Sequence, residues 1–202
     1  MKLTFAVLSL VLFSSFALDA KSRLGEYYLG FEYAMADGGK TKDLEADLFQ
    51  ITANSMASDS TDFIFNFSYG NVESNGTDDS SFTLGVDYVY HYDEYVFQNG
   101  MFRPFAGIGL SYIGDDMGLR LGDDGFGWSL LGGTEVLFTD KFSVLLGGRF
   151  LGLWSDFSEN DFHFNTALTY WINDIHGVAL EYTRAFDREV SFVGLKYLYS
   201  WQ

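Results

Sequence analysis

Residues 81–92 read SFTLGVDYVYHY, and this stretch decides the fold. Large apolar and aromatic side chains occupy every second position, and small or polar side chains occupy the positions between them. Successive residues of a β-strand point to opposite faces, so the second face of this segment contains Thr83, Gly85, Asp87, Val89 and His91, of which Val89 alone is a larger apolar residue. The pattern predicts a strand whose two faces meet different surroundings.

The same alternation recurs along the chain in segments of about ten residues, which polar breaks separate. The second segment is the weakest: Glu45 and Asp47 lie opposite Leu44, Ala46 and Leu48, and the alternation is then lost. The segments are 25–35, 43–53, 61–71, 81–92, 101–113, 126–138, 142–154, 162–172, 177–186 and 190–201. We therefore expect ten strands, with eight as the alternative because short hairpins near the C-terminus are easily miscounted.

The N-terminus has the layout of a secretory signal peptide. A basic start is followed by an apolar run from Leu3 to Phe13 and then by small and polar residues. The run is too short to cross a bilayer as a helix. We expect residues 1–20 to be cleaved after Ala20, or alternatively after Ala17, and residues 21–202 to form one barrel domain.

Composition excludes several classes of protein. The formal net charge of −16 would repel a nucleic-acid backbone and offers no basic surface for anionic lipid. Cysteine is absent, so no disulfide framework stabilises this exported chain. No later segment reaches ~18 consecutive apolar residues, which excludes a transmembrane helix after the signal. Aromatic residues make up 19% of the chain and glycine contributes 22 residues.

A membrane barrel fits this chain better than a soluble barrel with an apolar interior. The less apolar faces are rich in glycine and small residues, which suit a crowded bore. Aromatic residues gather at strand ends and predict girdles at the two bilayer interfaces: Tyr27, Tyr92, Tyr112, Trp128, Trp154, Trp171 and Trp201. Strands in lipid must close into a ring. The predicted fold is all-β, a closed antiparallel transmembrane β-barrel.

The connections between the strands suggest an orientation. With the N-terminus in the periplasm, the outward connections are 36–42, 72–80, 114–125, 155–161 and 187–189. The first four are acidic and polar, as expected of outer loops. The connections 54–60 and 93–100 on the other side are not short, so loop length supports this orientation only in part.

Three stretches carry a family resemblance. Phe102–Tyr112, Gly132–Phe150 and the strand that ends at Trp201 resemble segments of the small outer-membrane barrels of the OmpA-like and OmpW-like kind. The last resembles the sorting signal that the barrel-insertion machinery reads, although Trp201 and Gln202 replace the usual final Phe. The resemblance implies an outer-membrane barrel in contact with lipid and lipopolysaccharide, and it does not indicate which activity the protein has. We expect a monomer.

Charged residues are expected inside the bore, because a charge at the bilayer midplane costs about 2–4 kcal/mol. The predicted lumen cluster comprises Glu32, Asp87, Arg103, Glu135, Arg149, Glu181 and Lys196. Two pairings are hypothesised: an Arg103–Glu135–Arg149 cluster on three consecutive strands, and Glu181 directly opposite Lys196 across a two-residue turn. Such a lining fits either a sealed interior or a narrow pore.

The histidines give no convincing catalytic pattern. His163-Phe164-Asn165 departs from the His-x-Ser of outer-membrane lipid A deacylases, because Asn165 cannot attack an ester. Asp161-Phe162-His163 resembles the Asp-x-His pair of the omptin proteases, but Asp78-Asp79 has the wrong spacing for their second acidic pair. We predict no catalytic residue.

The acidic loop residues Asp115, Asp116, Asp123 and Asp124 fit no EF-hand, so no metal site and no cofactor are predicted. The leading function is a structural or surface-interaction barrel without enzymatic activity. A small pore for small solutes is the alternative, and an omptin-like rim protease is a remote one.

Overall fold

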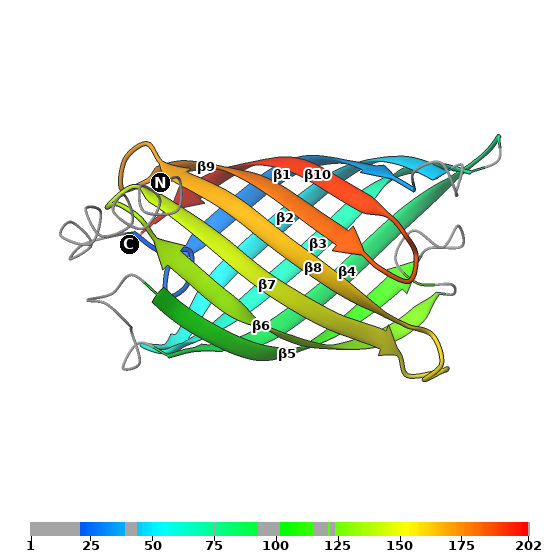
Figure 1. Cartoon of the computed structure of the whole chain (residues 1–202), viewed down its shortest axis with the longest axis horizontal. Coiled ribbons are helices and arrows are strands. Elements are labelled where there is room, and N and C mark those ends of the chain that lie inside the picture. The colour runs from blue at the N-terminus through cyan, green and yellow to red at the C-terminus, as the bar shows by residue number, and fades with distance from the viewer. Residues whose placement is uncertain are drawn as a thin grey trace, which may run out of the picture.

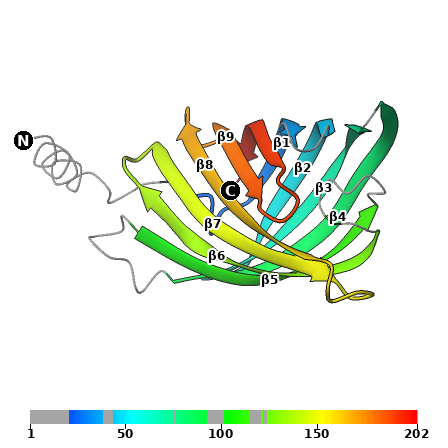
Figure 2. The ribbon, with the colours of Figure 1, turned by 45° about the vertical axis from the view of Figure 1, so that its right-hand side comes forward.

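The computed structural model describes residues 21–38, 44–74, 76–92, 102–114, 121 and 124–201. The expected signal peptide, the connection 93–100 and the loop acids Asp115, Asp116 and Asp123 lie outside the described residues. The described chain forms strands that pair antiparallel with their sequence neighbours, and β1 also pairs with β10, which closes the barrel. Figure 1 shows the tilted strands, and Figure 2 shows the wall from a second side.

The strands run along the chain in the order β1 to β10 around the barrel. Their bounds are β1 Tyr28–Asp37, β2 Leu44–Ser58, β3 Thr61–Ser74, β4 Thr77–His91, β5 Phe102–Gly114, β6 Gly125–Leu137, β7 Phe142–Leu153, β8 Asn160–Trp171, β9 His176–Ala185 and β10 Ser191–Ser200. The prediction of ten strands is confirmed, and the eight-strand alternative is wrong. None of the described residues forms a helix long and apolar enough to cross a membrane.

Two boundaries differ from the expectation. The segment 72–80 is not a long connection: β3 continues to Ser74 and β4 starts at Thr77, with Gly76 at a φ of +73° in the tight turn. This hairpin reaches far beyond its neighbours in Figure 1. Likewise β2 extends to Ser58, which shortens the expected connection 54–60. Strands that leave the bilayer can be polar on both faces, so composition alone does not mark where they end.

The outward face of the wall is apolar and exposed, and the inward face is covered. Leu195 is 63% exposed, whereas Lys196, the next residue, is 5% exposed. Soluble proteins rarely expose a contiguous apolar patch larger than a few hundred Å², so this surface requires lipid. Strands of 10 to 15 residues are long enough to cross a bilayer at a tilt.

The two ends of the barrel differ, and we name them by the chain. The near end is where β1 begins at Tyr28 and β10 ends at Ser200, and the far end is where β1 ends and β10 begins. Apolar clusters fill the inside at both ends. One near-end cluster contains Tyr28, Trp171, Ala179 and Leu198, and a second contains Leu24, Val89 and Phe105. One far-end cluster contains Ala34, Ala36, Leu44, Ala46, Leu48, Val72, Ala185, Val190 and Phe192. A second contains Ile113, Leu121, Leu151 and Leu153.

Candidate functional site

The bore between the apolar end clusters is the candidate functional site. All seven residues of the predicted lumen cluster lie at inward positions of the strands. Glu32, Asp87, Glu135 and Lys196 are each at most 5% exposed. Buried charges are tolerated only when they are paired and hydrogen-bonded, so their partners decide what the bore can do.

One ion pair crosses the bore from β7 to β4. The Arg149 guanidinium makes two parallel contacts to the Asp87 carboxylate, Nη2 to Oδ2 at 2.6 Å and Nη1 to Oδ1 at 2.9 Å. Asn66 Nδ2 donates to the same carboxylate at 3.2 Å, and Arg149 also donates to Ser129 at 3.2 Å. Gly109 makes room, because a Cβ there would overlap Asp87 Oδ1. Both carboxylate oxygens therefore have charged partners.

A second network lies beside the junction of β1 and β10. Lys196 Nζ is 3.0 Å from Glu32 Oε2 and 2.9 Å from Glu181 Oε1, and Arg23 Nη1 lies 2.8 Å from the same Glu181 oxygen. Two cations thus meet two carboxylates. The network is formally neutral, which removes the cost of burying an uncompensated charge.

The position of Glu181 corrects one expectation. Glu181 lies opposite Gly194, and Lys196 lies opposite Ala179, so the two are not direct cross-strand partners. They still meet, because they are diagonal neighbours and diagonal side chains of this length reach each other. The physical reason is the turn: residues 186–190 connect β9 to β10 instead of two residues.

The hypothesised Arg103–Glu135–Arg149 cluster is also corrected. Arg103 does lie directly opposite Glu135, but Arg149 lies opposite Leu131, four residues from Glu135 along β6. Four strand residues span about 13 Å, so Arg149 reaches Asp87 instead. The alternation within each strand predicts that two residues face the same side of the wall, but it does not predict that they lie at the same height along the barrel axis.

Glu135 instead binds the residues that precede β1. Ser22 donates its hydroxyl to Glu135, the backbone amide of Arg23 donates to both carboxylate oxygens at 3.2 and 3.3 Å, and Ser143 donates at 2.7 Å. Arg103 Nη1 donates to the Leu24 carbonyl at 2.7 Å. The chain before β1 therefore enters the near end of the bore, which sequence reasoning missed. Its only signal was the charged start Lys21-Ser22-Arg23.

Small polar cavities remain in the middle of the bore. One of about 200 Å³ and one of about 160 Å³ share lining residues, among them Thr52, Asn66, Asn165 and Thr183. A third of about 80 Å³ lies beside Glu32. Hydroxyl and amide groups surround paired charges here, so the cavities suit water or small polar solutes.

At the far-end rim, Asp161 serves the fold. Its carboxylate accepts backbone hydrogen bonds from Phe186 at 3.1 Å, Asp187 at 2.9 Å and Arg188 at 3.3 Å. His163 Nε2 lies 3.5 Å from the same carboxylate. Asp161 therefore anchors the turn between β9 and β10. This geometry gives no support to the omptin-like pair.

The connection between β7 and β8 at the far-end rim is also held by a carboxylate. In the exposed connection between β7 and β8, Asp156 accepts hydrogen bonds from the hydroxyl of Ser158 at 2.7 Å and from its amide at 2.8 Å. These bonds to the Ser158 side chain and backbone hold the pKa of Asp156 below its usual value. Such local bonds order a loop without creating reactivity.

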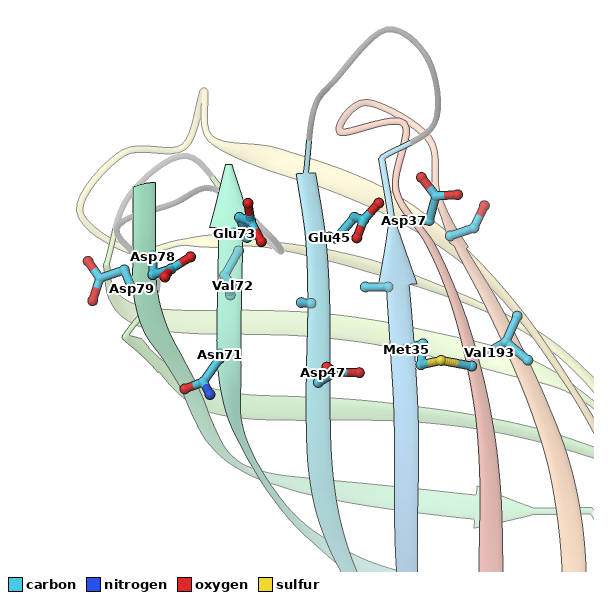
Figure 3. A pocket seen from close by; sticks show the side chains of 13 residues that line it. Met35, Asp37, Glu45, Asp47, Asn71, Val72, Glu73, Asp78, Asp79 and Val193 are labelled. Atoms are coloured by element: carbon cyan, nitrogen blue, oxygen red, sulfur yellow. The ribbon is translucent and has the colours of Figure 1, made fainter. Parts of the chain in front are cut away.

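An acidic row marks the far-end outer surface. Asp37, Glu45, Glu73 and Asp78 lie directly opposite one another on β1 to β4, and Figure 3 shows them side by side at a hollow of about 890 Å³. Four residues nearer the middle, an aromatic row follows the same pairing: Tyr33, Phe49, Tyr69 and Phe82. Carboxylates cannot face hydrocarbon cheaply, so the bilayer boundary lies between the two rows. No group of three or more described His, Asp or Glu residues could hold a metal ion.

Six of the expected interface aromatics point outward at a barrel end. Tyr27, Tyr92 and Trp201 lie at the near end, and Tyr112, Trp128 and Trp154 lie at the far end. Trp171 corrects the expectation: it is 1% exposed and packs inside against Tyr28 and Leu198. Gly177, directly opposite, leaves room for its ring. An aromatic residue at a strand end can thus fill the bore.

Several solved structures resemble this chain over most of its length. Solved structures of similar fold include an outer membrane channel from Pseudomonas putida F1, with a TM-score of 0.54 and 10% identity over 91% of this chain and 98% of that chain. The KdgM porin in complex with disordered oligogalacturonate has a TM-score of 0.48 and 11% identity, and the match covers 87% of this chain and 99% of that chain. Neisserial surface protein A has a TM-score of 0.44 and 13% identity, and the match covers 87% of this chain and 97% of that chain.

At 10% identity, the likeness to the Pseudomonas putida channel shows the fold alone. No curated protein matches the chain closely enough to count as a relative. A family model described as the outer membrane protein beta-barrel domain matches residues 5–169, most of the chain. The chain therefore belongs to the outer membrane protein beta-barrel domain family.

Proposed function

We propose that this protein is a closed integral barrel of the outer membrane with a structural or surface-interaction role, without enzymatic activity and without a permanently open pore. The observation that carries the proposal is the filled bore. Apolar clusters occupy both ends, and the polar middle is crossed by the Arg149–Asp87 pair and the network around Lys196. An ion would have to displace these groups to pass.

The absence of enzymatic activity is supported by the use of the polar groups. Asp161 and Glu135 are both fully buried, and each accepts backbone hydrogen bonds that hold a segment in place. A carboxylate committed in this way is a poor general base, because its lone pairs are occupied. With the near end toward the periplasm, the far-end hairpins would meet lipopolysaccharide and other surface partners.

A small pore is the second candidate, and the polar cavities favour it. The cavities of about 200 and 160 Å³ share their lining, and the residues around them are hydrophilic. A modest change in the bore would connect them.

Conductance in a planar lipid bilayer separates the two functions. The protein is first shown to be folded by gel migration with and without boiling, since folded membrane barrels resist detergent. The closed barrel predicts no sustained current steps from the inserted protein. Sustained, reproducible steps in wild-type protein would contradict the proposal and establish the pore.

A further inference from the structure

The segment before β1 lies inside the near end of the barrel. Ser22 is 4% exposed, Arg23 8% and Leu24 4%, although none of them belongs to a strand. Gly25, with a φ of +73°, makes the turn that brings the chain back to β1. The segment therefore enters the bore and returns within a few residues.

Side chains of the wall recognise the main chain of this segment. Besides the Glu135 and Arg103 contacts, Asp62 Oδ2 accepts from the Gly25 amide at 2.8 Å. Asn54 Nδ2 donates to the Glu26 carbonyl at 2.7 Å and to the Arg23 carbonyl at 3.4 Å. These partners come from β2, β3, β5 and β6. Together with β4, these strands form one continuous part of the barrel wall.

Two side chains of the segment are bound as well. Arg23 joins the ionic network through Glu181, and Leu24 packs against Val89 and Phe105. The bore thus offers an anionic partner for the guanidinium and an apolar pocket for the leucine. Strand pairing is not involved, so the segment can leave without breaking the barrel ladder.

The segment also lines one of the polar cavities. The cavity of about 160 Å³ is lined on one side by Arg23, Leu24 and Tyr28, and farther inside by Arg149 and Lys196. Removing the segment would extend this cavity toward the near end.

We propose that residues 21–26 are a displaceable plug, bound to a dedicated site in the near-end bore, that controls the entry of water and small polar solutes into the cavity above it. This inference rests on the proposed closed state and deepens it, because it names the part of the chain that keeps the near end shut. The ligand of the site is the chain's own segment.

The test measures entry into the cavity by thiol chemistry. The chain has no cysteine, so Thr183→Cys, which lines all three cavities, provides a single reporter. A small hydrophilic methanethiosulfonate is added to the folded protein, and the rate of modification is followed by mass. Leu24→Asp is the main plug variant, because it would bury a carboxylate in the apolar pocket of Val89 and Phe105.

We expect Leu24→Asp to raise the modification rate at least about tenfold, which corresponds to a shift of about 1.4 kcal/mol between the bound and released plug. Ile175→Asp is the matched control: it places the same charge on an exposed turn of the same end and should leave the rate unchanged. Glu135→Gln, a change in the wall residue that binds Ser22 and Arg23, should also raise the modification rate. If it fails to fold, Leu24→Asp still tests the proposal, because it leaves the wall intact.

The outcomes separate this proposal from the one it rests on. An unchanged rate in folded Leu24→Asp, with wild-type protein silent in the planar bilayer, overturns the plug alone. The plug is also overturned if Thr183→Cys with an unchanged segment 21–26 is modified as fast as a cysteine at an exposed position. Sustained wild-type current overturns the closed barrel first.

Discussion

Lys196 of β10 lies directly opposite Glu32 of β1, and the two side chains form an ion pair of 3.0 Å across the strands that close the barrel. The next inward residue on β10 toward the far end is Gly194, where a Cβ would overlap the Glu32 carboxylate. The first and last strands have no hairpin between them, so side-chain pairing across this junction supports their register. The same pair neutralises charge inside the bore.

Removing Lys196 should therefore weaken the closure of the barrel. Lys196→Met leaves Glu32 without its cation and Glu181 with Arg23 only. Loss of one partner from a buried ion pair costs about 3–5 kcal/mol, because the remaining charge stays buried. We expect the free energy of unfolding in urea to fall by an amount of this order, measured by tryptophan fluorescence in lipid vesicles.

Lys141→Met is the control for this variant, since Lys141 is exposed in the turn between β6 and β7. Its unfolding midpoint should not move. Adding Glu32→Gln to Lys196→Met should recover part of the loss, because the carboxylate that has lost its cation is then neutral. Additive losses in the double variant would show that the pair does not couple β1 to β10.

Gly109 permits the second ion pair, and its replacement should disturb that pair. A Cβ at position 109 would overlap Asp87 Oδ1, which Arg149 holds in place. Overpacking of this kind costs about 1–3 kcal/mol. We expect Gly109→Ala to lower the urea midpoint. Gly85→Ala is the matched control on the neighbouring strand, because its Cβ would lie 3.4 Å from the nearest atom, an ordinary contact. Equal effects of both variants would contradict this account.

Asp161 should control the order of the turn between β9 and β10. Asp161→Ala removes the acceptor of three backbone amides, and hydrogen bonds to a charged group are worth about 1.5–3 kcal/mol each. We expect trypsin to cleave after Arg188 at least about tenfold faster, as followed by mass spectrometry. Asp156→Ala, at an exposed carboxylate in the neighbouring connection, should leave this cleavage unchanged. A resistant turn in Asp161→Ala would mean that the packing of Phe186 and Val190 holds it.

The strand pattern predicted the ring, but the second segment shows why its ends were uncertain. In β2, Phe49 faces lipid and Gln50 faces the bore, whereas toward the far end Leu48 is buried inside and Asp47 is exposed outside. The apolar face changes from outside to inside where the strand leaves the bilayer. Periodicity reports that two faces differ, and it does not report which solvent each face meets.

The inward charges could be predicted because parity within a strand is strict. Their partners could not be predicted, because the height of a residue along the barrel axis depends on turn lengths and strand tilt. Arg149 shares a face with Glu135 and still binds Asp87, three strands away. The plug was invisible for a related reason: Ser22 and Leu24 carry no periodic signal, and their binding partners are spread over several strands.

Trp171 offers a direct test of which way a strand-end aromatic points. Trp171 is 1% exposed inside the near end, with the Lys21 ammonium 4.5 Å from its ring centroid, whereas Trp201 at the same end is 41% exposed. Two variants that each keep one of these tryptophans, with the other three replaced by Phe, are placed in vesicles of brominated lipid. Bromine quenches by contact, so the variant with Trp201 should lose much of its fluorescence and the variant with Trp171 little. Equal quenching of both would place Trp171 in the girdle and the register of β8 in error.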